Sequence, residues 1–84
     1  MLHVFSILDS RAELFGNPVF TVSLGGAIRS FEDEARNKES PIAQHPRDYE
    51  LYHLGEFDPE SGSFNLFDAP KRLCYATDFV KPQE

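Results

Sequence analysis

The sequence predicts an α+β fold in which a small, mostly antiparallel sheet of three to five strands carries one amphipathic helix on one face. Apolar residues alternate with a period of two near both 2–8 and 48–58, as in strands. Between 24 and 36 the apolar period changes to helical spacing. The order is strand, short strand, helix, strand, strand and a final strand, which implies an antiparallel sheet with the helix packed against it.

The first strand is expected at 2–8, with Phe5 and Ile7 on one face and Leu2 and Val4 on the other. Asp9 and Ser10 suit a turn, and a Gly-Asn-Pro cluster at 16–18 is a second break. The β-rich run at 19–22 is then a short strand or an extended approach to the helix.

The helix is the best-supported element. Its apolar positions have helical spacing and charged residues occupy the opposite face; the apolar positions are Leu24, Ala27, Ile28, Phe31 and Ala35. Ser23 is the expected N-cap, and Asn37 with the Pro41 beyond it ends the helix.

The C-terminal half is predicted as a mobile loop at 38–47, a strand at 48–58 and a hairpin turn at 58–62 that leads to a strand at 64–67. Pro70 is expected to break the chain. The segment 71–80 then forms a last strand or a frayed helix. One helix cannot cover two sheet faces, so the face with Tyr52, Leu54 and Phe67 is expected to be a dimer interface or a ligand platform.

Length and charge limit the class of protein. The 84 residues suit a single domain over 1–84. Fourteen acidic against eight basic residues give a net charge of −6, which is opposite in sign to a phosphate-binding surface. Composition alone therefore places nucleic-acid binding below protein binding.

The lone Cys74 excludes an internal disulfide, and a secreted domain this small would usually need several. The first eight residues lack a basic export signal, and no window approaches a membrane span of ~20 apolar residues. A cytoplasmic protein is expected.

No catalytic or metal-binding pattern is present. His3, His45 and His53 share no ligand spacing, and Cys74 has no His or Cys partner nearby in the sequence. The Gly25-Gly26 pair matches neither the P-loop nor the dinucleotide pattern, so a tight entry turn for the helix explains it better. We expect a binding or regulatory protein that is not an enzyme and uses no cofactor or metal.

Basic residues are scattered in the sequence, although they could converge in space. A small basic rim beside exposed aromatic rings could hold a single strand, because stacking contributes about 1–3 kcal/mol per base. The candidate phosphate contacts are Arg29, Arg47, Lys71 and Arg72, and the candidate stacking residues are Tyr52 and Phe67.

Four short motifs occur in series: DSRA at 9–12, FGNPVF at 15–20, AIRSF at 27–31 and DYELYHLGEFD at 48–58. In order and spacing they resemble the small non-structural protein of gokushovirus-type microviruses, phages with single-stranded DNA genomes. The resemblance runs from Phe5 to Asp58. It implies DNA binding and a part in moving replication from duplex intermediates to single-stranded genomes for the capsid.

Two functions remain open at this point. The first is a single-stranded DNA-binding protein that uses the open sheet face in the cytoplasm of an infected bacterium. The second is a dimeric adaptor that regulates a phage or host replication or assembly protein without touching DNA. Self-association, with a dimer favoured, is expected in either case because the chain is short and both sheet faces carry apolar groups.

Overall fold

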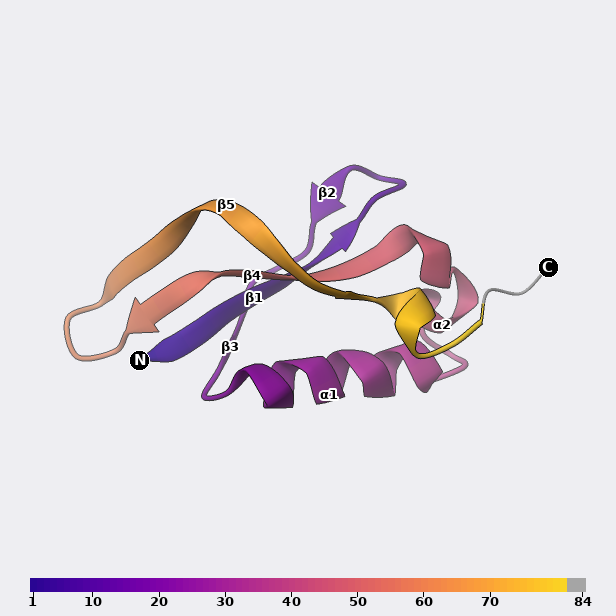
Figure 1. Cartoon of the computed structure of the whole chain (residues 1–84), viewed down its shortest axis with the longest axis horizontal. Coiled ribbons are helices and arrows are strands. Elements are labelled where there is room, and N and C mark those ends of the chain that lie inside the picture. Colours follow the sequence, from indigo (N-terminus) through magenta and orange to yellow (C-terminus); the bar gives the residue numbers. More distant parts are fainter. Residues whose placement is uncertain (82–84) are drawn as a thin grey trace.

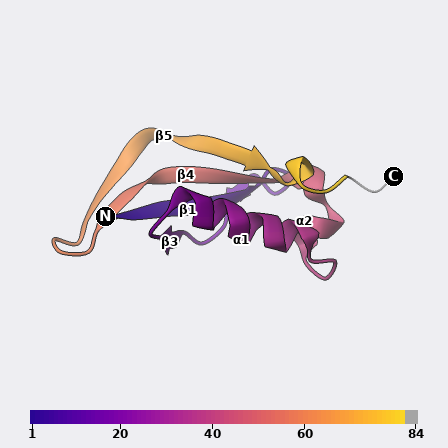
Figure 2. The same cartoon turned by 60° about the horizontal axis from the view of Figure 1, so that its bottom comes forward.

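A computed structural model describes residues 1–81, and its layers are a mostly antiparallel sheet with one main helix on one face (Figures 1 and 2). The predicted α+β fold class is confirmed. The elements in chain order are β1 (Leu2–Asp9), β2 (Leu14–Phe15), β3 (Val19–Thr21), α1 (Leu24–Arg36), α2 (Pro41–Gln44), β4 (Tyr49–Asp58) and β5 (Ser63–Tyr75). Two 3-10 turns, Pro46–Asp48 and Ala76–Asp78, flank the β4–β5 hairpin.

The sheet order is β2-β1-β4-β5, and β3 pairs with β1 as well. All the pairings are antiparallel. The strand β1 therefore lies between β4 on one side and the short strands β2 and β3 on the other. The strand β5 forms the opposite edge of the sheet.

The helix α1 begins and ends where the sequence predicts. The Oγ of Ser23 accepts a hydrogen bond from the backbone N–H of Gly26 at 3.0 Å, and Asn37 is the C-cap. The helix packs against β1 and β4 through Ala27, Phe31 and Ala35, whereas Ile28 is half-buried and Leu24 is 39% exposed, so the apolar spacing marks the core in part. The buried core cluster is Phe5, Ala27, Phe31, Ala35, Ile42, Leu51 and Ala76.

The expectation of an irregular loop at 38–47 is wrong, because this segment contains α2 and the first residues of a 3-10 turn. Ser40 caps α2 by accepting a hydrogen bond from the N–H of Ile42 at 3.2 Å. Pro41 occupies the first helical position, where its missing N–H costs nothing. Two prolines and a serine were interpreted as loop composition, but here they start helical turns.

The expected break at Pro70 is also wrong, because β5 continues through it. Gly55 pairs with Leu66 and His53 pairs with Lys71, so residues 67–70 bulge out opposite the single residue Leu54. A proline within a bulge removes no ladder hydrogen bond, and the strand can therefore resume after it.

The C-terminal segment differs from the expected strand at 71–80. β5 ends at Tyr75, where the backbone N–H donates to Oδ2 of Asp78 at 2.8 Å and closes a 3-10 turn. The expected fraying falls partly on residues 82–84, which lie outside the described residues. The two-residue strand β2 was not predicted.

The molecule is elongated, with principal extents of 47 × 23 × 17 Å. The helix α1 lies under one half of the sheet, and the β4–β5 hairpin extends beyond it as an arm (Figure 1). The face of the sheet opposite α1 is called the open face below. It carries no helix along the part of the chain that the structure describes (Figures 1 and 2).

Candidate nucleic-acid interface on the open face

Four of the six candidate residues lie on the β4–β5 pair, but they are divided between its two faces. Tyr52 is the cross-strand partner of Arg72, and Lys71 follows the bulge that contains Phe67. Arg29 lies on the exposed side of α1, and Arg47 lies exposed in the 3-10 turn before β4. The structure therefore places Arg29 on the other side of the sheet from Tyr52 and Arg72, and Arg47 just before the start of β4.

An aromatic cluster with one arginine occupies the open face. The guanidinium of Arg72 lies 4.5 Å from the ring centre of Tyr75, in cation–π contact. The ring of Phe15 packs edge-on against that of Tyr52, with centroids 5.3 Å apart. Phe15 and Tyr75 remain 43% and 40% exposed. The open-face cluster, as we call it, comprises Phe15, Tyr52, Arg72 and Tyr75.

An acidic residue balances the charge of this cluster. Oε1 of Glu50 accepts from Nη1 of Arg72 at 3.5 Å and from the hydroxyl of Tyr52 at 3.4 Å. The neighbouring Tyr52 side chain raises the pKa of Arg72, and the charges around it add to this effect. The guanidinium therefore stays charged, but a phosphate would have to compete with Glu50 for it.

Phe67 does not share the open face with Tyr52, contrary to the expectation. Its ring packs edge-on against His53 with centroids 4.8 Å apart, and Nζ of Lys71 lies 4.1 Å from the Phe67 ring centre. Successive residues of a strand point to opposite faces, so Tyr52 and His53 do as well. The sequence pattern could not place Phe67, because the bulge at 67–70 changes the register of β5.

Two members of the open-face cluster were missed at the sequence level. Phe15 belongs to one of the motifs quoted above, but its strand has only two residues and was assigned to a turn region. Tyr75 and Cys74 are successive residues, so a strand at 71–80 places their side chains on different faces. Without the β4–β5 register, the pairing of Glu50 with Tyr75 could not be known.

The single cysteine has the properties of a packing residue. Cys74 is half-buried beside the core, and burial raises the pKa of its thiol to about 11. The thiol is therefore protonated at neutral pH, which makes it a poor nucleophile. Within residues 1–81 no group of three or more His, Cys, Asp or Glu side chains is placed to hold a metal ion.

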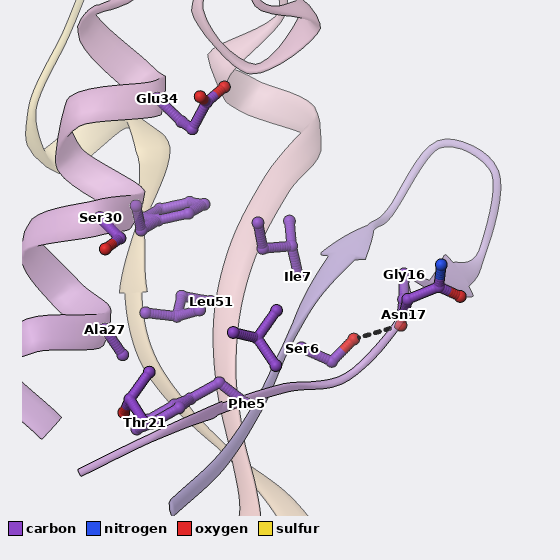
Figure 3. Close-up of a pocket in the computed structure, with 12 residues that line it drawn as sticks. Phe5, Ser6, Ile7, Gly16, Asn17, Thr21, Ala27, Ser30, Glu34 and Leu51 are labelled. Carbon is purple, nitrogen blue, oxygen red and sulfur yellow. Dashed lines mark hydrogen bonds between the residues drawn. The ribbon is translucent and has the colours of Figure 1, made fainter. Parts of the chain in front are cut away.

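A cavity of about 340 Å³ lies on the other side of the sheet, between α1, β1 and the segment that joins β2 to β3 (Figure 3). Its wall includes the core residues Phe5, Phe31 and Leu51. At one side of the cavity, the hydroxyl of Ser6 donates a hydrogen bond to the carbonyl oxygen of Gly16 at 2.7 Å. The one charged residue in its lining is the acidic Glu34, so the cavity offers no positive charge to a phosphate.

A family model described as phage ORF5 protein matches residues 2–79. The chain belongs to this family, and the phage origin implied by the sequence resemblance is confirmed. No curated protein and no solved structure matches the chain. No helix among residues 1–81 is both long and apolar enough to cross a membrane.

Proposed function

We propose that the chain is a gokushovirus-type non-structural protein that binds single-stranded DNA through the open-face cluster. The observation that carries the proposal is the contact of Arg72 with Tyr75 beside Tyr52, on a face that α1 does not cover. Exposed rings beside a cation are what a sequence-tolerant single-strand site requires, because every base has a π-face and every linkage has a phosphate.

The proposed roles differ between the residues of the cluster. The half-exposed rings of Phe15 and Tyr75 stack on bases, and Tyr52 supports Phe15 from the side. Arg72 contacts a phosphate. Lys71 pairs with His53 and its Nζ lies over the Phe67 ring, so it faces away from the cluster and is assigned no role in it. Arg29 lies on α1, on the other side of the sheet, and is assigned no role in the cluster. Arg47 lies in the 3-10 turn that precedes β4 and is assigned no role either.

The net charge of −6 sets the expected strength and salt response. Each phosphate neutralised on a single strand contributes a slope of about −0.7 to log affinity against log salt, so the single contact through Arg72 gives about −0.7. This shallow slope separates the proposed site from a strongly basic one. Duplex DNA binds more weakly, because its bases are not available for stacking.

The biological role follows from binding alone and requires no catalysis. In the cytoplasm of the infected bacterium, the protein occupies newly exposed single strands and so favours single-stranded genome synthesis or packaging over a return to duplex. The family resemblance and the open-face cluster support this role.

Fluorescence anisotropy with a short labelled oligothymidine, measured across a salt series, tests the proposal. Arg72→Ala should weaken binding and make the salt slope shallower by about 0.7, whereas Arg29→Ala, which removes the same charge from α1 on the other side of the sheet, is a matched control that should change neither. Tyr75→Ala removes a stacking ring and should weaken binding by about 1–3 kcal/mol. No binding by the wild type at low salt and tens of micromolar protein would refute the proposal.

The acidic charge favours a second candidate function, that of a dimeric adaptor. Such a protein would regulate a phage or host replication or assembly protein without DNA contact. It would show no oligonucleotide binding in the experiment above but would still self-associate, so the two functions are separable with the same purified protein.

A further inference from the structure

A second surface lies on the arm, beyond the end of α1 (Figure 1). The cross-strand register places Phe20, Val4, Gly55 and Leu66 in one row across β3, β1, β4 and β5. The next row along the arm contains Leu2, Phe57 and Phe64. Both rows lie on the open face and contain only apolar residues and one glycine. The arm patch is defined as Phe20, Phe57, Phe64 and Leu66.

The arm patch is ordered by its own contacts and remains open to solvent. The rings of Phe57 and Phe64 lie 4.8 Å apart between centroids, and those of Phe20 and Phe57 lie 5.5 Å apart. Phe64 is nevertheless 54% exposed and Leu66 is 61% exposed. Contiguous apolar surface of this kind is rare on a soluble monomer and marks an interaction site.

The dimensions of the chain indicate how much surface is available for contact with a partner. The chain exposes 5802 Å², whereas a folded monomer of 9.6 kDa exposes about 5,100 Å². Its radius of gyration is 13.2 Å, against about 11.8 Å for a compact domain of this length. The excess surface of about 700 Å² is close to the ~800 Å² that each partner buries in a standard interface.

We propose that two copies of this chain form a two-fold dimer by packing their arm patches face to face. A two-fold interface uses the same patch on both copies, so a surface without charges is self-complementary. The chain carries a net charge of −6, and burial of charged groups between two copies would be costly. The arm patch contains none.

Packing through the face is favoured over pairing of the β5 edges. The outer edge of β5 is interrupted by the bulge at 67–70 and by Pro70, and Lys71 follows directly. Bulges, prolines and lysines are the devices by which edge strands avoid pairing with another chain. The free edge is therefore protected, while the arm patch is not.

This interface goes beyond the proposed DNA-binding function and uses different residues. The bulge at 67–70 separates the arm patch from Arg72 and Tyr75, so the two surfaces share no residue. Dimer formation and DNA binding should respond to salt in opposite directions. Added salt screens the repulsion between two acidic chains and strengthens the dimer, whereas it weakens DNA binding.

Light scattering coupled to size exclusion, over a concentration series at low and high salt, tests the proposal. The wild type should reach twice the chain mass of 9.6 kDa at high micromolar concentration, and at lower concentration when salt is added. Leu66→Lys should remain monomeric. Leu14→Lys is the matched control, because Leu14 is 67% exposed but lies in β2, away from the arm, and it should dimerise like the wild type.

A monomeric wild type at both salt concentrations would overturn the proposal, as would equal loss of the dimer in both lysine variants. If Leu66→Lys does not fold, NMR of the wild type on dilution gives the answer: ring signals of Phe20, Phe57 and Phe64 should shift with concentration. If only other signals shift, the interface lies elsewhere. Because Leu66→Lys should keep the single-strand affinity of the wild type, failure of the dimer and failure of DNA binding can be told apart.

Discussion

The ring of His53 stacks on the ring of Phe5, with centroids 4.9 Å apart and planes inclined by 22°. The stack places a titratable side chain in the interior, where its Nε2 is buried without a hydrogen-bond partner. The ring of His3 lies 5.2 Å away, and Lys71 and Glu56 are the other charged groups that act on His53. Burial, followed by the effect of His3, lowers the pKa of His53.

The first prediction is therefore a loss of stability in mild acid. The unfolded chain takes up a proton near the ordinary His pKa of about 6.5, whereas the folded chain takes it up only at lower pH. The free energy of unfolding should be level above that value and should fall as the pH drops below it. Urea denaturation between about pH 8 and pH 5 measures this dependence.

Two variants identify the group responsible. His53→Phe keeps an aromatic ring between Phe5 and Phe67 and should remove most of the pH dependence in this range. His45→Gln should leave it intact, because His45 is exposed. An unchanged profile in His53→Phe would show that another group is responsible.

The second prediction concerns the contact between helix and sheet. Phe31 is buried between α1 and the sheet and contacts Phe79 edge-on, at 6.3 Å between centroids. Phe31→Ala should cost roughly 3–5 kcal/mol of stability, enough to unfold much of a small domain. Leu14→Ala removes an exposed side chain and should leave the melting temperature nearly unchanged. Equal melting of Phe31→Ala and the wild type would contradict the observed helix position.

The third prediction compares two glycines. Gly55 has a φ of +152°, and a Cβ there would lie 2.4 Å from the carbonyl oxygen of Asn65 and 2.6 Å from Cα of Leu66. Gly55→Ala must move the β5 backbone, at a cost of at least about 1–3 kcal/mol. Gly25→Ala should instead stabilise α1 by about 0.5–1 kcal/mol, because a Cβ there meets no atom within 4 Å. Thermal melts that order the two variants the other way would refute this account.

The boundaries of α1, which depend on local signals, agree with the structure, whereas the features that depend on register do not. Ser23 and Asn37 bound α1 because capping is a contact within a few residues of sequence. The effect of Pro70 depends on what lies across the strand. It sits in a bulge opposite Leu54, and nothing within its own segment reveals that position.

The same distinction applies to the candidate site. Residue types alone selected Tyr52 and Arg72, and the structure pairs them across β4 and β5. They could not show that Arg29 lies on the other side of the sheet from Tyr52, because tertiary structure sets that position. They also could not find Phe15, which reaches Tyr52 only because β2 pairs with the far end of β1.

The last prediction concerns Glu50, whose carboxylate contacts both Arg72 and Tyr52. Glu50→Gln keeps the shape of the side chain and removes the charge that competes with a phosphate for Arg72. Single-strand affinity should rise roughly two- to fivefold, the range expected for the loss of a partly exposed ion pair. Glu56→Gln is the matched control, since it changes the net charge equally on the same strand. The extra residue Leu54 shifts the alternation of β4, so Glu56 pairs with His3 and lies on the face opposite that of Glu50. Anisotropy titrations at low salt should show the gain in Glu50→Gln alone. An equal gain in both variants would indicate a general charge effect and would remove Arg72 from the proposed phosphate contact.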